Sequence, residues 1–321
     1  MNVASIGELL VDIIPRSAGT YKEGMLFEAH LGGAPFNYAV ILSRLGGHVC
    51  GFGAVGNDAF GKMLIKILEE NNVDTSGIKI KNARTSLAFV ILRDDGERSF
   101  FFYRSPWANT ADTMFTAEDL DFNYLEKASA LYVSGMALAV PPLRNAVIEA
   151  MRFSYQHGLE VIFDFNVRLD VWRSKKDLIE TYRSIFPYAT ILALSLDEAK
   201  TLYDTENPKS VMHILRKYKK KLWIKMGNKG AIVVEGNRAT YAEAFKVKAI
   251  DATGAGDAWA AALTYYHLLK GMSIKDSIIY ANAMGALIVT SRGAIGKFVN
   301  EKVLEEFMQS QPKISVKEID L

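Results

Sequence analysis

The chain has 321 residues, of which 50% are hydrophobic and 23% charged, so it can bury a large core and is not globally disordered. Lysine plus arginine number 38 and aspartate plus glutamate 36, a balance that gives no reason to expect nucleic acid or an anionic membrane as partner. The single cysteine, Cys50, excludes an internal disulfide, and neither a signal peptide nor an apolar run of membrane-spanning length is evident. We therefore expect a cytoplasmic α/β protein with one large domain, alone or with a small one attached.

The first predicted element is a buried strand over residues 3–14, which two acids, Glu8 and Asp12, interrupt. Acids near strand ends most often face water at the rim, and this is the common expectation for both. Asp12 has a second interpretation, because ligands of open α/β sheets bind at strand ends.

A glycine-rich segment follows and reads Gly32-Gly33-Ala34-Pro35-Phe36-Asn37, after which a helical pattern over 38–45 stops at Gly46-Gly47. The two leading glycines would let the backbone approach a ligand closely. Asn37 offers a donor and an acceptor to a sugar hydroxyl, although a plain loop and helix cap would use the same residues.

Two nucleotide-binding motifs are matched only in part. Residues 51–56 fit the Gly-x-Gly-x-x-Gly dinucleotide fingerprint but lack a full preceding strand. Residues 56–62 fit most of a phosphate-binding loop, yet Met63 stands where a serine or threonine should hold magnesium. We interpret this region as a strand, a turn and a helix over 60–71. An NAD-dependent dehydrogenase remains a rival hypothesis, which binding of NAD without ATP would reveal.

The clearest hairpin joins residues 87–93 and 97–104 through the turn Asp94-Asp95-Gly96. Its aromatic run over 100–103 would place apolar surface on both faces of the hairpin. One face can cover the core or a ligand, while the other needs a second cover such as a partner subunit.

Beyond Phe122 the pattern alternates between strand and helix, which predicts a doubly wound, mostly parallel sheet with helices on both faces. Asn166 and Arg168 follow the predicted strand over 161–165, and strand ends of this kind point into the ligand cleft. Arg168 offers a planar fork to a phosphate or a carboxylate.

The stretch from Asp251 to Tyr266 begins with a glycine-rich turn and continues as a strong helix former. Small residues over 254–256 would leave the first N–H groups of that helix bare, which creates a place to hold a phosphate. Asp257 would repel this phosphate, so it makes better sense as the base that takes a proton from an attacking hydroxyl. In isolation, such a motif would more often be a turn and a helix cap.

The complete pattern Asp-x-Thr-Gly-x-Gly-Asp over 251–257, together with Gly-Gly-x-x-x-Asn over 32–37, resembles the two signatures of the ribokinase-like (phosphofructokinase-B type) carbohydrate kinases. The resemblance covers essentially the whole chain and implies an ATP- and Mg²⁺-dependent sugar kinase. It also implies an α/β core over 1–11, 32–85 and 111–321, and a small β-sheet lid over 12–31 and 86–110, where a homodimer contact would form.

The resemblance further implies roles for individual residues. Asp257 would be the general base, and the phosphoryl group would lie on the N–H groups of Gly254, Ala255 and Gly256. The sugar would be bound by Asp12, Gly32, Gly33, Asn37, Arg104, Asn166 and Arg168, and the nucleotide by Lys225, Gly227, Gly230 and Asn282. Glu198 would act on magnesium indirectly, although Ser195 replaces the usual asparagine of its motif. Asp251 and Thr253 would hold a monovalent cation such as K⁺, as in many relatives.

The motifs divide on the preferred sugar. Residues 32–35 and 102–106 resemble fructokinases, residues 134–138 look closer to 2-keto-3-deoxygluconate kinases, and Asn109 departs from the usual fructokinase pattern. An acidic substrate needs a nearby cation, for which Arg104 and Arg168 are the candidates. Asp12, Gly33 and Asn37 suit a neutral sugar, and we favour fructose, phosphorylated at its 6-hydroxyl. A catalytically silent sugar-binding protein is the remaining rival.

Overall fold

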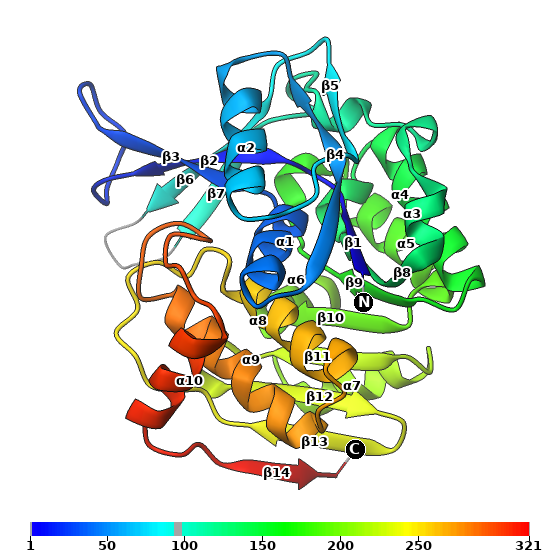
Figure 1. Ribbon diagram of the computed structural model, residues 1–321, viewed down its shortest axis with the longest axis vertical. Helices are drawn as coiled ribbons and strands as arrows, with labels where there is room; N and C mark the ends of the chain where they lie inside the picture. The colour runs from blue at the N-terminus through cyan, green and yellow to red at the C-terminus, as the bar shows by residue number, and fades with distance from the viewer. Residues whose placement is uncertain (1, 93–97, 321) are drawn as a thin grey trace.

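The computed structural model describes residues 2–92 and 98–320, and its strands form two separate sheets (Figure 1). The large sheet has ten strands in the order β14-β13-β12-β11-β10-β9-β8-β1-β4-β5. Its strands are β1 (Asn2–Ile6), β4 (His48–Gly56), β5 (Ile78–Lys81), β8 (Ala128–Ser134), β9 (Glu160–Asp164), β10 (Ile191–Ser195), β11 (Lys221–Lys225), β12 (Ala231–Glu235), β13 (Arg238–Ala242) and β14 (Val316–Ile319). The small sheet has the order β3-β2-β6-β7, with β2 (Leu10–Pro15), β3 (Phe27–Gly32), β6 (Ser86–Leu92) and β7 (Arg98–Tyr103).

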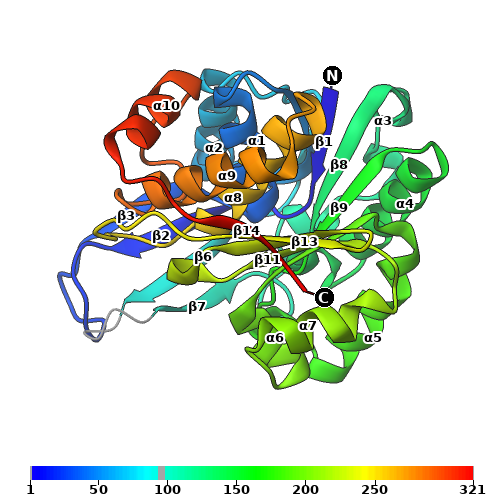
Figure 2. The same ribbon diagram turned by 90° about the horizontal axis from the view of Figure 1, so that it is seen from below.

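Neighbouring strands of the large sheet run parallel from β5 to β11, and the pairs β11–β12, β12–β13 and β13–β14 are antiparallel. Helices cover both of its faces (Figure 2). One face carries α1 (Ala34–Arg44), α2 (Ala59–Glu70), α8 (Ala255–Leu263), α9 (Ile274–Ile288) and α10 (Glu301–Ser310). The other carries α3 (Phe122–Lys127), α4 (Leu143–Gln156), α5 (Lys175–Ile185), α6 (Leu196–Tyr203) and α7 (Pro208–Arg216). A sheet covered on both faces explains the apolar runs of its strands and confirms the predicted doubly wound class.

The expectation of one strand over residues 3–14 is wrong. The chain leaves the large sheet after β1 and enters the small sheet at β2, and Gly7 lies between them with a φ of 151°. A Cβ at Gly7 would lie 2.7 Å from Cγ of Pro35, so the crossing requires glycine. The apolar pattern continues through the crossing because both strands are buried, which hides the break from sequence inspection.

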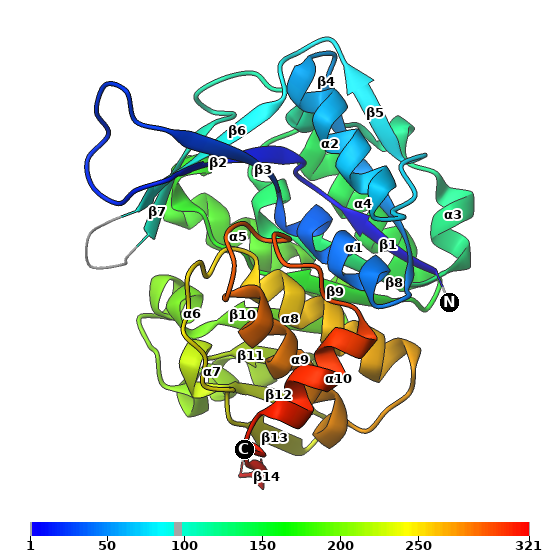
Figure 3. The same ribbon diagram turned by 60° about the vertical axis from the view of Figure 1, so that its left-hand side comes forward.

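The small sheet projects from one side of the α/β body (Figure 3). The predicted hairpin is present as β6 and β7, paired from Leu87 opposite Tyr103 to Leu92 opposite Arg98, while its predicted turn at 94–96 lies outside the described residues. The rings of Phe89 and Phe101 stack at 5.0 Å, and Tyr103 is 57% exposed. Exposed aromatic surface therefore occurs on this sheet, as the aromatic run predicts.

The glycines at 51–56 lie inside β4 and not in a turn before a helix, so the dinucleotide fingerprint has no structural counterpart here. Asp58 caps α2 by accepting a hydrogen bond from Gly61 N at 2.8 Å. In the described parts of the chain, none of the helices has the length and apolar character that crossing a bilayer requires.

Candidate active site

A cavity of about 710 Å³ opens where strands of the large sheet end beneath the small sheet. Its wall includes residues from β2, β7, β11 and the first turn of α8, together with the segments that follow β9 and β10. The strands β8 to β11 are parallel, so their carboxyl ends meet at one edge of the sheet, which is where doubly wound folds bind ligands.

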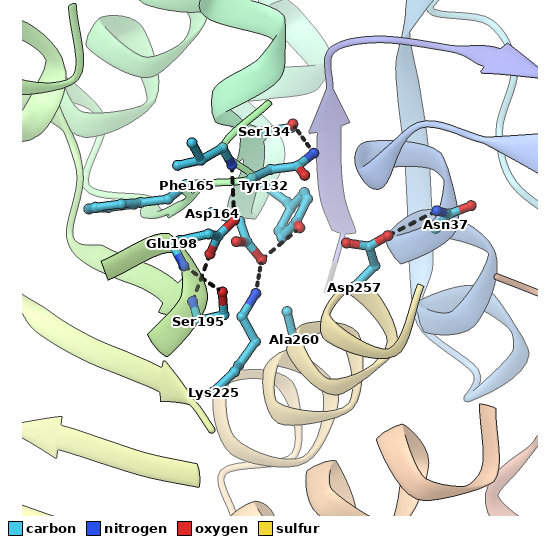
Figure 4. Close-up of polar contacts among 12 residues, drawn as sticks. Asn37, Tyr132, Ser134, Asp164, Phe165, Ser195, Glu198, Lys225, Asp257 and Ala260 are labelled. Carbon is cyan, nitrogen blue, oxygen red and sulfur yellow. Dashed lines mark hydrogen bonds and ion pairs between the residues drawn. The ribbon is translucent and has the colours of Figure 1, made fainter. Parts of the chain in front are cut away.

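Asp257 stands in the first turn of α8 and faces the cavity (Figure 4). Its Oδ2 accepts a hydrogen bond from Asn37 Nδ2 of α1 at 2.9 Å, across 220 positions of sequence. Burial raises the pKa of Asp257 to about 6, against the opposing effect of the Asn37 hydrogen bond. A carboxylate with this pKa is ionised at neutral pH and still basic enough to accept a proton.

The turn before α8 depends on glycine. Gly254 has a φ of 75°, and a Cβ there would lie 2.3 Å from Cβ of Ala294. Gly254 and Gly256 line the cavity, whereas Ala255 is not among the described lining residues and its N–H donates to Ala252 O at 3.3 Å. The positive end of the helix dipole thus faces the cavity beside Asp257.

Asp12 lines the same cavity from strand β2. Burial, reinforced by the charge of Asp257, raises the pKa of Asp12 to about 8. A Cβ on Gly32 would lie 2.5 Å from Cγ of Asp12, so glycine is needed to leave room for this carboxyl group. Two acids with separated pKa values suit different tasks, with Asp12 protonated as a donor and Asp257 ionised as an acceptor.

Two cationic side chains enter the cavity from the large sheet. Lys225, at the end of β11, places Nζ 2.6 Å from Oδ2 of Asp164 at the end of β9 (Figure 4). Arg168 lines the wall with its guanidinium 5.3 Å from the ring centre of Phe100, and its Nη1 donates to Val167 O. Cations near a helix N-terminus make this side of the cavity suitable for phosphate.

Ser195 and Glu198 form a capping box at the start of α6. Ser195 Oγ accepts from Glu198 N at 3.2 Å, and Glu198 Oε2 accepts from Ser195 N at 2.7 Å. The other oxygen of Glu198 accepts from Val167 N at 2.9 Å. Ser195 therefore orients Glu198, and both residues line the cavity.

Several predicted site residues lie outside the cavity wall as far as the described residues show. Arg104 is fully buried, and its Nε donates to Asp112 Oδ2 at 2.7 Å. Asn282 accepts from Trp259 Nε1 and donates to two backbone carbonyls. Asp251 accepts from the N–H groups of Thr253 and Gly293. The predicted residues that do line the cavity are Asp12, Gly33, Asn37, Asn166, Arg168, Glu198, Lys225, Gly227, Thr253, Gly254, Gly256 and Asp257.

The expectation of a water-facing rim position is wrong for Glu8, which is fully buried and lines the cavity. Its Oε1 accepts from Ser134 Oγ at 2.8 Å and from Asn166 Nδ2 at 3.3 Å. Asn166 itself has a φ of 38°, a region that asparagine tolerates better than most residues. Burial raises the pKa of Glu8 to about 7. The sequence shows Glu8 as an acid directly after Gly7, but no local pattern identifies the hydrogen-bond partners of Glu8.

The chain is similar in sequence and in structure to known carbohydrate kinases. The family described as pfkB family carbohydrate kinase matches residues 1–301. Fructokinase-1 of Zea mays is 36% identical over 309 residues, which cover 93% of this chain and 95% of that protein. The structure of fructokinase with bound ATP from Xylella fastidiosa aligns with a TM-score of 0.85 at 27% identity, covering 96% of this chain and 98% of that one. Fructokinase from Vibrio cholerae O395, in a form with fructose, ADP and calcium, aligns with a TM-score of 0.84 at 30% identity, covering 95% and 98%.

Proposed function

The chain belongs to the pfkB family of carbohydrate kinases and is a sugar kinase, and we propose that it phosphorylates fructose on the 6-hydroxyl with ATP. The observation that carries this proposal is the position of Asp257. Its carboxylate lies at the positive end of α8, is hydrogen-bonded to Asn37, and shares the cavity with Asp12. A hydroxyl held there would lie between a proton acceptor and a phosphate-holding turn.

The reaction uses Asp257 as general base. The 6-hydroxyl oxygen forms a bond to the γ-phosphorus, the bond from that phosphorus to the bridging oxygen of ADP breaks, and the hydroxyl proton passes to Asp257. The N–H groups in the first turn of α8, with Gly254 and Gly256 lining the cavity, hold the oxygens of the transferring group.

A neutral sugar fits the charges of the cavity better than an acidic one. With its pKa of about 8, Asp12 donates to a sugar hydroxyl at neutral pH, and Asn37 and Asn166 add polar contacts. Of the two arginines predicted for a substrate carboxylate, Arg104 is paired with Asp112 and buried away from the cavity wall, among the described residues. Arg168 remains, and ATP phosphate competes for it. These features support fructose over 2-keto-3-deoxygluconate.

ATP would lie along the loop after β11, where Lys225 and Gly227 line the cavity, and Mg²⁺ would accompany its phosphates. No group of three or more histidine, cysteine or acidic side chains in the described chain could hold a metal ion. This fits Mg²⁺, which keeps several waters and takes its ligands largely from substrate phosphates. Glu198 would bind such waters, since each carboxylate oxygen retains a lone pair, and the ion would neutralise phosphate charge. Asp251 and Thr253 remain the proposed position for K⁺.

We further propose that the small sheet acts as a lid. Phe100 and Phe102 of β7 line the cavity and would exclude water from the sugar. Leu26 and Tyr103 of the same region are 63% and 57% exposed, and they are the proposed contact of a homodimer.

The decisive experiment compares kcat/KM for fructose and for 2-keto-3-deoxygluconate with ATP and Mg²⁺. We expect fructose to be preferred and ³¹P NMR to locate the phosphate on carbon 6. A tenfold preference for the acid, about 1.4 kcal/mol in transition-state binding, would overturn the choice of sugar. Sugar binding without transfer would instead indicate a silent binding protein.

A further inference from the structure

Two ion pairs link the same two strands of the large sheet at opposite ends. At the amino ends of β11 and β9, Lys221 Nζ lies 2.5 Å from Glu160 Oε1. At the carboxyl ends, Lys225 Nζ lies 2.6 Å from Asp164 Oδ2. The Lys221 pair is partly exposed, at 32% and 31%, whereas the Lys225 pair is 13% and 3% exposed and lines the cavity. Stabilisation of the sheet is a sufficient role for the Lys221 pair. It does not explain why the Lys225 pair is buried and lines the cavity.

The Lys225 ammonium also lies against the start of α8. A Cβ on Gly256 would be only 3.2 Å from Lys225 Nζ. The N-terminus of a helix carries partial positive charge, so a cation beside it is repelled unless an anion joins them. Asp164 supplies one anion to Lys225, and the cavity, which both Lys225 and Gly256 line, leaves a place for a second anion. A phosphoryl group at that place would attract both the ammonium and the helix N–H groups.

Asp164 retains a partner when Lys225 turns toward such a phosphoryl group. Tyr132 of β8 donates from its hydroxyl to the same Oδ2 at 3.1 Å (Figure 4). The ring of Tyr132 stacks on that of Tyr38 with 3.9 Å between their centres. Burial lowers the pKa of Lys225, but the carboxylates of Asp164 and Glu198 outweigh it and raise that pKa overall. The lysine thus stays protonated, and its hydrogen bond to Asp164 can be exchanged without leaving that carboxylate unpaired.

We propose that Lys225 is a catalytic residue of the phosphoryl transfer, with Asp164 and Tyr132 as the residues that position it. The inference rests on the proposed kinase function and goes beyond binding of the nucleotide. Lys225 donates hydrogen bonds to the oxygens of the transferring group while the bond to the sugar oxygen forms and the bond to ADP breaks. Asp257 takes the hydroxyl proton, and Lys225 keeps its own. Lys225 interacts with the negative charge on those oxygens more strongly during transfer than in bound ATP. Removal of the Lys225 ammonium must therefore lower kcat more than it weakens ATP binding.

The test compares Lys225→Met with Lys221→Met, the matched removal of a lysine from the pair at the other end of the same strands. We expect Lys225→Met to lower kcat for fructose by roughly 10²–10³, the usual loss for one charge-stabilising donor. The Kd for ATP, measured by calorimetry, should rise by much less than kcat falls, and Lys221→Met should keep kcat. Equal kcat for the two folded variants would overturn the role of Lys225.

Chemical rescue separates a catalytic ammonium from a structural one. In Lys225→Cys, alkylation with 2-bromoethylamine rebuilds a lysine in which sulfur replaces Cγ, and Cys50 is buried and therefore protected. Recovery of kcat on alkylation supports the proposal, and no recovery in a folded, fully alkylated protein contradicts it. This pair of measurements also decides the case if Lys225→Met does not fold.

The positioning role is tested by a double-mutant cycle. If Asp164 acts through Lys225, Asp164→Asn lowers kcat in the unmodified background but has little further effect in Lys225→Met. Additive losses would remove Asp164 from this role. Phosphorylation of fructose by the unmodified chain is measured first, because its absence would overturn the proposed function and this inference together, whereas the outcomes above affect Lys225 and Asp164 alone.

Discussion

The large sheet and the small sheet contribute different kinds of residue to the cavity wall. From the large sheet and α8 come Asp257 and Lys225, each held by a hydrogen-bonded partner from a distant part of the chain. From the small sheet come Asp12 and the rings of Phe100 and Phe102, while the outer residues of that sheet include the exposed Tyr103. Asp257 and Lys225, the groups proposed for the chemistry, thus lie on elements of the α/β core, whereas Asp12, one of the groups proposed to bind the sugar, lies on the small sheet that also carries exposed aromatic residues.

The same residue type also behaves differently in the two regions. Burial raises the pKa of Asp257 to about 6, with Asn37 limiting the rise, whereas burial and the charge of Asp257 raise that of Asp12 to about 8. At neutral pH the large-sheet region therefore presents an acceptor and the small sheet a donor.

The largest effect is expected from Asp257→Asn. The amide keeps the shape of the side chain and removes a charge that repels phosphate, so ATP binding should persist. Turnover of fructose should fall by roughly 10²–10⁴, the usual contribution of a general base. A steady-state assay together with ATP titration checks both parts, and near-normal kcat would exclude Asp257 as the base.

Gly32→Ala disturbs the sugar side alone. The added Cβ would lie 2.5–2.7 Å from the carboxyl atoms of Asp12 and displace them. A shift of about 1 Å in a substrate-holding group can cost on the order of 10²-fold, so kcat/KM for fructose should fall by that amount while the Kd for ATP is unchanged. Gly285→Ala in α9 is the matched control, since its Cβ would meet only ordinary contacts at 3.6 and 3.9 Å. A loss of ATP binding in Gly32→Ala would show that the two sides are not separable.

The pH profile of kcat/KM for fructose should show the ionisation of both Asp257 and Asp12. The rate should fall about tenfold per unit below the Asp257 pKa of about 6, because the base becomes protonated. It should also fall above about 8, because Asp12 ionises and loses the proton it donates. Asp12→Asn keeps a donor at every pH, so it should remove the alkaline limb and leave the acid limb. A variant profile that still falls near pH 8 would contradict the assignment of Asp12.

The smallest effect is expected from Ser195→Ala, which removes the cap of α6. We expect a loss of about 1 kcal/mol in the free energy of unfolding, measured by urea denaturation. Ser174→Ala is the matched control, because Ser174 caps α5 by accepting from Asp177 N at 3.0 Å. If Ser195 orients Glu198 for magnesium, the Ser195 variant alone should need more Mg²⁺ for half-maximal activity. Identical Mg²⁺ dependence in both variants would limit Ser195 to a capping role.

Features that depend on a few neighbouring residues could be predicted from the sequence. The turn and helix over 251–263 and the hairpin of β6 and β7 are two such features. The crossing between sheets at Gly7 could not be predicted, because the apolar pattern is the same in both strands. The burial of Glu8 could not be predicted for another reason, since its partners Ser134 and Asn166 lie far away in the sequence.

The doubly wound class, the family and the glycine turn that leads to Asp257 could be inferred from local patterns and motifs. Which polar groups come into contact depends instead on how distant parts of the chain pack together. Asn37 reaches Asp257 across 220 positions, Asn166 reaches Glu8 across 158, and Lys225 reaches Asp164 across 61. Packing also pairs Arg104 with Asp112, and Arg104 is not among the described residues that line the cavity. The reason is physical: secondary structure follows from interactions between near neighbours, whereas burial and charge pairing are fixed when distant strand ends are packed against one edge of the sheet.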